Sequence, residues 1–321
     1  MPTPEMRKAR HVALAWGAGL GPAGFRRVVA HFGSPAAVMA ASEQELALPS
    51  LRLDPGQIQL ISSLKARLDT FRAELSQLKQ EYISVYCDWE EGFPTLLKGI
   101  RNPPVVVCVA GRLLPEDDPA IAIIGTRTPT PDGARMARDL GAAFARTGTT
   151  VVAGLARGCD TEAHYGALEA GGRTIAVLGS GIRVITPREN LSLARLIFER
   201  GAVLSEQPPS VQPTTATLMA RNRLQSALSR GVIVVEARAT GGSINTAESA
   251  LDQGRLLLAV RWPDNRETAA GTNALIHRGA LPIRGPGDAP AIRLQIADHI
   301  GRMRSAAKIT AVQPSLFPDA D

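Results

Sequence analysis

Three short segments of the 321-residue chain carry residue types that contact phosphate groups in proteins. Gly125-Thr126-Arg127 follows a short apolar run, and Arg221-Asn222-Arg223 places two arginines around an amide side chain. The third segment, 241–248, combines two glycines with hydroxyl and amide side chains. Free backbone N–H groups of glycine-rich turns, hydroxyls and the planar guanidinium of arginine all suit phosphate. The sequence therefore predicts anion binding at three places far apart along the chain.

The first of these segments is expected to join a buried strand to a helix. The run 120–124 is short, unbroken and apolar, which is typical of a parallel strand covered on both faces. Thr130 is a candidate N-cap, Pro131 suits the first helical position, and Gly148 is expected to close the helix. Such a turn directs backbone N–H groups and the helix dipole at an anion. The alternative is that Arg127 is only a surface charge.

Similar apolar runs recur as far as about residue 284. They lie at 151–153, 174–178, 232–235 and 256–260, with helix-like segments between them. This alternation predicts a parallel sheet with helices on both faces. Ligands of such sheets bind beyond the carboxyl ends of the strands, so the loops at Gly125, Gly154 and Gly179 and the loop after Glu236 are expected to gather at one edge.

Residues 8 to about 80 are expected to form separate helices, followed by flanking strands at 82–87 and 105–109. The turn Gly19-Leu20-Gly21-Pro22 resembles that of a helix-hairpin-helix unit, whose amides can approach phosphate, with Arg26 and Arg27 nearby. A small helical interaction domain is the favoured interpretation. The segment Arg221-Asn222-Arg223 is expected to precede a further helix, and Asp160 to cap another.

Composition narrows the class of protein. The 36 basic and 30 acidic residues give a net charge of +6, which mildly favours a polyanionic partner. The three cysteines lie far apart, which predicts no metal site and a reducing compartment. Without a signal peptide or a long apolar span, a cytoplasmic location and no membrane contact are expected. Aromatic residues make up only 4%, few for a protein that binds single strands by stacking bases.

Nucleotide-binding motifs are weak. The chain has no Gly-x-x-x-x-Gly-Lys-Ser/Thr segment, and its first turn lacks Gly-x-Gly-x-x-Gly, so no cofactor is expected. Segment 241–248 partly resembles the phosphoribohydrolase motif Pro-Gly-Gly-x-Gly-Thr-x-x-Glu, but lacks its Pro and third Gly. A nucleotide-cleaving enzyme and a nucleotide sensor remain as alternatives.

From roughly 80 to 285 the chain resembles the DNA-processing protein A (DprA/Smf) family. The matching segments follow in order at 123–127, 153–160, 163–164, 174–181, 205–206, 221–223, 242–247, 254–255 and 273–280. The N-terminal helices resemble the family's SAM-like or helix-hairpin-helix domain more loosely. An aromatic that the family usually has shortly before Arg221 is replaced by Leu218-Met219-Ala220.

The resemblance implies an α/β fold, an extended Rossmann-like doubly wound parallel sheet with a small all-helical N-terminal domain. The implied parts are 1–80, 81–285 and a C-terminal helix and tail over 286–321 without a winged-helix domain. The implied function is non-enzymatic: binding of single-stranded DNA, protection of incoming DNA, and loading of the RecA recombinase in natural transformation and recombination. The implied DNA contacts are Gly125, Thr126, Arg127, Arg157, Gly179, Ser180, Arg221, Asn222, Arg223, Gly242, Ser243, Asn245 and Thr246. A homodimer is also implied, built near Leu275, Ile276 and Leu281.

The segment Gln313-Pro314-Ser315-Leu316-Phe317-Pro318 has a different implication. Its prolines disfavour a helix and hold the chain extended. It resembles the short peptides by which DNA enzymes dock on the bacterial sliding clamp, with Gln313 as the polar contact and Leu316 and Phe317 as the apolar ones. The alternative is that Leu316 and Phe317 pack on this protein's own surface.

Overall fold

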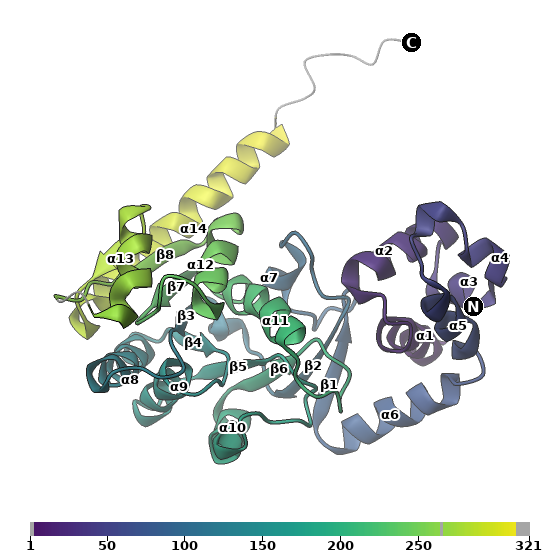
Figure 1. Cartoon of the computed structure of the whole chain (residues 1–321), viewed down its shortest axis with the longest axis horizontal. Helices are drawn as coiled ribbons and strands as arrows, with labels where there is room; N and C mark the ends of the chain where they lie inside the picture. The colour runs from purple at the N-terminus through teal and green to yellow at the C-terminus, as the bar shows by residue number, and fades with distance from the viewer. Residues whose placement is uncertain (1–2, 264–265, 313–321) are drawn as a thin grey trace, which may run out of the picture. The chain divides into compact units, whose positions relative to one another are not determined.

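A computed structural model describes residues 3–263 and 266–312 (Figure 1). The described strands form one mostly parallel sheet in the order β1-β2-β6-β5-β4-β3-β7-β8-β9, as predicted for a doubly wound α/β protein. The strands are β1 (Ile83–Cys87), β2 (Val106–Gly111), β3 (Ala120–Ile124), β4 (Thr150–Ala153), β5 (Thr174–Leu178), β6 (Ala202–Ser205), β7 (Gly231–Val234), β8 (Leu256–Val260) and β9 (Leu281–Ile283).

Helices fill most of the remaining chain. The α-helices are α1 (Pro4–Gly17), α2 (Gly21–Phe32), α3 (Pro35–Ala40), α4 (Glu43–Leu46), α5 (Pro55–Leu64), α6 (Leu68–Gln80), α7 (Thr95–Lys98), α8 (Pro131–Arg146), α9 (Cys159–Glu169), α10 (Leu191–Arg200), α11 (Thr215–Ala227), α12 (Gly242–Asp252), α13 (Ala270–His277) and α14 (Ala289–Val312). Short 3-10 helices are η1 (Pro49–Leu51), η2 (Pro115–Asp117), η3 (Arg188–Asn190), η4 (Glu267–Ala269) and η5 (Pro286–Asp288). No helix in the described ranges is long and apolar enough to cross a membrane.

The chain divides into two compact units. The first unit comprises residues 1–113 and 175–228, and the second comprises 114–174 and 229–321. In the first unit β2 runs antiparallel to both β1 and β6, while β5 and β6 are parallel. The helices expected before residue 80 are α1 to α6, and they belong to this unit.

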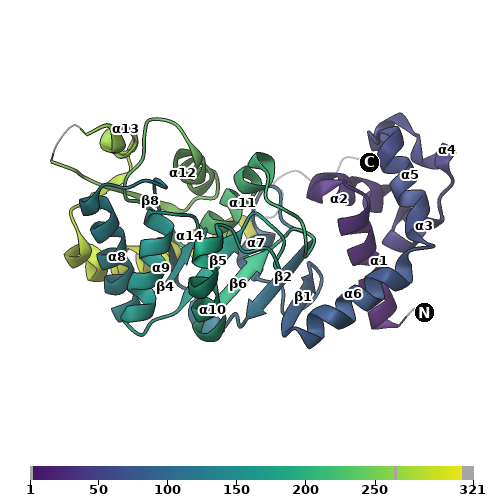
Figure 2. The same cartoon turned by 60° about the horizontal axis from the view of Figure 1, so that its bottom comes forward.

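The second unit holds the strand and helix around the Gly-Thr-Arg turn. β3 is fully buried and parallel to both β4 and β7. The Thr130 hydroxyl accepts the Gly133 N–H and caps α8, as predicted, and Pro131 occupies the first turn. Figure 2 shows α8 and α9 side by side over the strands, and one apolar core joins both helices to α14. Each large apolar side chain buried in this core stabilises the fold by about 2 kcal/mol relative to exposure.

Two local expectations are wrong. Arg221-Asn222-Arg223 lie inside α11 rather than before a helix, because a capping box formed by Thr214 and Thr217 starts that helix earlier. Asp160 does not cap α9, which follows Gly158. Its carboxylate lies in the first turn and instead accepts the backbone N–H of Gly154, at 2.9 Å.

Candidate nucleic-acid interface

The residues predicted to contact DNA fall into two groups, one in each unit. The second unit carries Gly125, Thr126, Arg127, Arg157, Gly242, Ser243, Asn245 and Thr246. The first unit carries Gly179, Ser180, Arg221, Asn222 and Arg223. Gln313, Leu316 and Phe317 lie outside the described residues.

Arg127 is the exposed cation of the Gly-Thr-Arg turn. The turn itself is fixed, since the Thr126 N–H donates to the Glu236 carbonyl at 2.7 Å and the Thr126 carbonyl accepts the Cys159 N–H at 3.2 Å. A Cβ at Gly125 would overlap the Cys159 sulfur, so close packing requires glycine there. Arg127 makes no hydrogen bond or ion pair within the described part of the chain. A rigid turn therefore holds a guanidinium that is available to an external anion.

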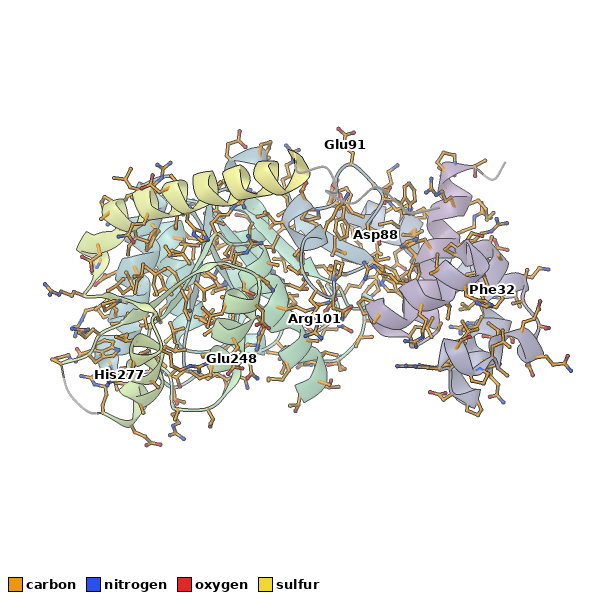
Figure 3. The ribbon with its side chains drawn as sticks, turned by 90° about the horizontal axis from the view of Figure 1, so that it is seen from above. Phe32, Asp88, Glu91, Arg101, Glu248 and His277 are labelled. Carbon is orange, nitrogen blue, oxygen red and sulfur yellow. The ribbon has the colours of Figure 1, made fainter. Side chains whose placement is uncertain are left out.

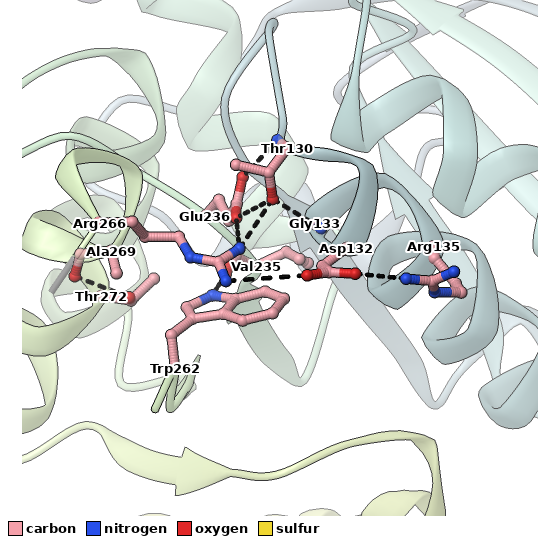
Figure 4. Close-up of polar contacts among 10 residues, drawn as sticks. All are labelled: Thr130, Asp132, Gly133, Arg135, Val235, Glu236, Trp262, Arg266, Ala269 and Thr272. Carbon is pink, nitrogen blue, oxygen red and sulfur yellow. Dashed lines mark hydrogen bonds and ion pairs between the residues drawn. The ribbon is translucent and has the colours of Figure 1, made fainter. Parts of the chain in front are cut away.

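The first turn of α8 is already occupied by an anion, the carboxylate of Glu236 (Figure 4). Glu236 follows β7 and is fully buried. Its Oε2 accepts the Thr130 N–H at 2.9 Å, and its Oε1 accepts the Thr130 hydroxyl at 2.7 Å. The expectation that this helix N-terminus would bind an external anion is therefore wrong, because the chain supplies the anion.

Arg266 completes this cluster and was missed from the sequence. Its Nη1 donates to Glu236 at 3.2 Å and to the Thr130 hydroxyl at 2.9 Å. The guanidinium carbon lies 4.6 Å from the centre of the Trp262 ring, and the indole N–H donates to the Val235 carbonyl at 2.8 Å. The segment after β8 has no motif that would identify Arg266 or Trp262. The acidic residue Glu236, which directly follows the apolar run 232–235, is a sequence signal that could have indicated a charged group at the end of this strand.

The start of α12 lies against the Gly-Thr-Arg turn. The Ser243 hydroxyl donates to the Gly125 carbonyl at 2.8 Å, which joins two segments separated by 118 residues. Gly241 and Gly242 are exposed, and no side chain caps this helix. Thr246 is buried and its hydroxyl donates to the Gly242 carbonyl at 3.0 Å. The prediction that these two loops meet at one edge of the sheet is confirmed within the second unit.

The two arginines of α11 are held by the first unit itself. Arg221 is buried, and its guanidinium donates to the Val177 carbonyl and to the Asn222 side chain. Arg223 forms a two-point ion pair with Glu206, at 2.6 and 3.0 Å. Glu206 belongs to the family-like segment 205–206, whose sequence does not identify it as a counter-ion. Both arginines therefore have internal partners.

The turn after β5 is packed inside the first unit. Ser180 is buried and its hydroxyl donates to the Val184 carbonyl at 2.6 Å, while the Ser180 carbonyl accepts the Ser205 hydroxyl at 2.6 Å. A Cβ at Gly179 would lie 2.9 Å from the Cα of Leu218, so glycine permits the close approach of α11. Packing within the first unit therefore accounts for the presence of both Gly179 and Ser180, without a contact to a ligand.

The arginines beside the turn between α1 and α2 also serve the fold. Arg26 donates to the Pro103 carbonyl at 2.7 Å, and Arg27 donates to the Leu51 carbonyl at 2.7 Å. Both arginines therefore have partners within the first unit.

Reactive groups and metal ligands are sparse. No group of three or more His, Cys, Asp or Glu side chains within the described ranges could hold a metal ion. The cysteines are free and buried, and burial raises the pKa of the Cys108 thiol to about 12. Burial also raises the pKa of Cys87 and of Cys159, so all three thiols stay protonated at neutral pH.

The fold and these loops define a doubly wound α/β protein with basic and hydroxyl side chains at the carboxyl end of β3. Residues 84–290 match the family described as DNA recombination-mediator protein A. The chain is 35% identical over 247 residues to DNA processing protein DprA of Bacillus subtilis, covering 73% of this chain and 83% of that protein. It is 34% identical over 274 residues to protein Smf of Synechocystis sp., and the match covers 83% of this chain and 68% of that protein. The chain belongs to the DNA recombination-mediator protein A family.

Solved structures show the same fold. The X-ray structure of DprA from Streptococcus pneumoniae matches with a TM-score of 0.73 and 28% identity, over 91% of this chain and 98% of that one. The structure of DprA from Helicobacter pylori, which is described for its single-stranded DNA binding mode, also matches. Its TM-score is 0.60 and its identity 30%, over 66% of this chain and 96% of that one.

Proposed function

We propose that this protein binds single-stranded DNA without catalysis and loads a RecA recombinase onto it during natural transformation. Family membership supports a role in DNA recombination. The H. pylori relative, with 30% identity, is described as binding single-stranded DNA. The observation that carries the proposal is Arg127, an exposed guanidinium on a rigid turn that is hydrogen-bonded to the start of α12. A guanidinium placed in this way suits the phosphates of a strand of any sequence.

The proposed contacts differ in kind between the two groups. In the second unit Arg127 and Arg157 are exposed, so their charges can face phosphate directly. The neighbouring hydroxyl and amide groups of Ser243, Asn245 and Thr246 are proposed to fix the start of α12. In the first unit Arg221 and Ser180 are buried, so their proposed role is to shape the surface presented to DNA.

A direct test is a salt titration of binding to oligo-dT and to duplex DNA of equal length. Binding is expected to favour oligo-dT, with an affinity that falls linearly on a log–log salt plot, because phosphate contacts release counter-ions. Equal affinity for both DNA forms would contradict the proposal. Loading is tested separately by RecA filament formation on strands coated with single-strand-binding protein.

The absence of catalysis is also part of the proposal. The alternative of a nucleotide-cleaving enzyme depends on segment 241–248, whose Glu248 is exposed on α12 (Figure 3). Release of free base from nucleoside monophosphates by the purified protein would support that alternative.

A homodimer and a cytoplasmic location remain part of the proposed function. β9 stands at the end of the strand order, and Leu281 on it is 38% exposed. Leu275 is buried, so it is assigned to the core of the second unit rather than to a dimer surface. Ile276 is half-buried and remains a candidate contact. Docking on the sliding clamp through Gln313, Leu316 and Phe317 is proposed from the sequence alone.

A further inference from the structure

The carboxyl end of β3 is the position at which a doubly wound sheet would bind a nucleotide. β3 lies between β4 and β7 and is parallel to both, so the order of the strands reverses here. In such sheets the ligand enters the crevice at this reversal, and its phosphate lies at the N-terminus of the helix that follows the strand. That helix is α8.

The carboxylate of Glu236 lies at the N-terminus of α8, and both of its oxygens accept hydrogen bonds. The Thr130 N–H and hydroxyl, together with Arg266, donate to its two oxygens at 2.7 to 3.2 Å. The Gly133 N–H donates to the Thr130 hydroxyl at 3.1 Å and so joins the first turn of α8 to the cluster (Figure 4). The side chain of Glu236 is fully buried. Backbone N–H, hydroxyl and guanidinium donors are the groups that hold phosphate at helix N-termini.

Gly133 shows how closely the carboxylate approaches the helix. A Cβ at this position would overlap the Glu236 carboxylate, so the first turn of α8 has room for the carboxylate only because residue 133 is glycine. Arg266 is held independently, since it stacks on Trp262 and lies 3.8 Å from Asp132. The Arg266 guanidinium therefore keeps these two contacts if the carboxylate of Glu236 is removed.

We propose that Glu236 is a built-in substitute for phosphate, which closes the N-terminus of α8 to inorganic phosphate and to free nucleotides. An anion tethered in the same chain competes at a high effective concentration, and it repels a second anion at close range. Glu236 is thus a specificity-determining residue of the crevice. The inference goes beyond DNA binding and does not depend on it.

The test is chemical rescue of Glu236→Ala by inorganic phosphate. Thermal unfolding is followed in 0 to about 20 mM phosphate, with ionic strength held constant by chloride. The Tm of Glu236→Ala is expected to rise saturably, by about 3 °C at a phosphate concentration tenfold above Kd, because phosphate binds only the folded state. The Tm of the wild type is expected not to respond. Glu236→Gln is the matched control, since its amide still fills the space and no response is expected.

Two results would overturn the proposal. One is a folded Glu236→Ala whose Tm does not respond to phosphate, and the other is a wild-type response equal to that of the variant. If Glu236→Ala does not fold, calorimetric titration of the wild type with AMP decides. No binding at about 10 mM supports the proposal, whereas binding that Arg266→Ala abolishes overturns it. Neither result alters the proposal of single-stranded DNA binding, which the salt titration tests.

Discussion

Glu206 binds both terminal nitrogens of Arg223, at 2.6 and 3.0 Å, in a pair whose side chains are 8% and 16% exposed. The positive charge that the sequence assigns to DNA is therefore neutralised within the first unit. Arg127 has no such partner within the described ranges of the chain. Arginines that look equivalent in the sequence are thus expected to behave differently when they are replaced.

Arg223→Ala is expected to lower the free energy of unfolding by about 3 kcal/mol, because it leaves Glu206 as a buried carboxylate without its counter-ion. Urea unfolding followed by circular dichroism measures this loss. The double variant Arg223→Ala with Glu206→Ala is the control, and it is expected to be more stable than Arg223→Ala alone. Unchanged stability combined with a smaller salt slope would show instead that Arg223 mainly contacts phosphate.

Arg127→Ala is expected to leave the unfolding free energy unchanged, since the side chain is exposed. It is expected to weaken binding to oligo-dT and to lower the slope of log K against log salt by about 0.7, the value for one lost phosphate contact. Arg146→Ala, an exposed arginine at the opposite end of α8, is the matched control and should preserve the slope. Equal slopes for wild type and Arg127→Ala would remove Arg127 from the interface.

The elements around the site could be predicted because their signals are local. The apolar run of β3 and the pair Thr130-Pro131 define a strand, a turn and a helix start within about a dozen residues. The meeting of Ser243 with Gly125 followed from the rule that loops of a parallel sheet converge at its carboxyl edge.

The partners of the charged groups could not be predicted in the same way. Glu236 reaches Thr130 across 106 residues, and Arg266 reaches it across 136. Only the tertiary fold brings such groups together, so a turn that looks ready for an external anion can already hold an internal one. The burial of Arg221 could not be predicted for the same reason, because its guanidinium donates to the Val177 carbonyl, 44 residues away in the sequence.

His11 is expected to make stability depend on pH. It is buried, with Nε2 3.0 Å from the Val105 carbonyl and its ring 4.6 Å from that of Phe25. Burial lowers the pKa of His11, and this outweighs the opposite effects of Asp88 and the Val105 carbonyl. As the pH falls below about 6.5, His11 is therefore protonated in the unfolded chain but not yet in the folded chain. The free energy of unfolding decreases over this range, until the pH reaches the lower pKa of His11 in the folded chain. Above pH about 6.5 His11 adds no pH dependence.

The measurement is urea unfolding of wild type and His11→Gln between pH 8 and 5. The stability of the wild type relative to His11→Gln is expected to be constant above pH about 6.5 and to fall below it. A difference that stays constant over the whole range would show that burial does not control the protonation of His11.

A peptide covering 309–321 is expected to bind purified sliding clamp, because two adjacent apolar side chains between prolines can enter a pocket at low ordering cost. Replacing Leu316 and Phe317 together by alanine should abolish binding in a calorimetric titration. A peptide of the same composition in scrambled order is the control. No binding at high micromolar clamp would end the hypothesis.

Leu281→Glu is expected to shift the protein from dimer to monomer without unfolding it. Leu281 is 38% exposed on β9, which pairs with β8 and ends the strand order, so a charge there meets water in the monomer but would be buried in a dimer. Sedimentation velocity at micromolar concentration measures the shift. Leu275→Ala is the contrasting variant: Leu275 is 2% exposed, so its loss should lower stability by about 3 kcal/mol and leave the dimer intact. A monomeric wild type, or a dimer that persists in Leu281→Glu, would remove β9 from the proposed interface.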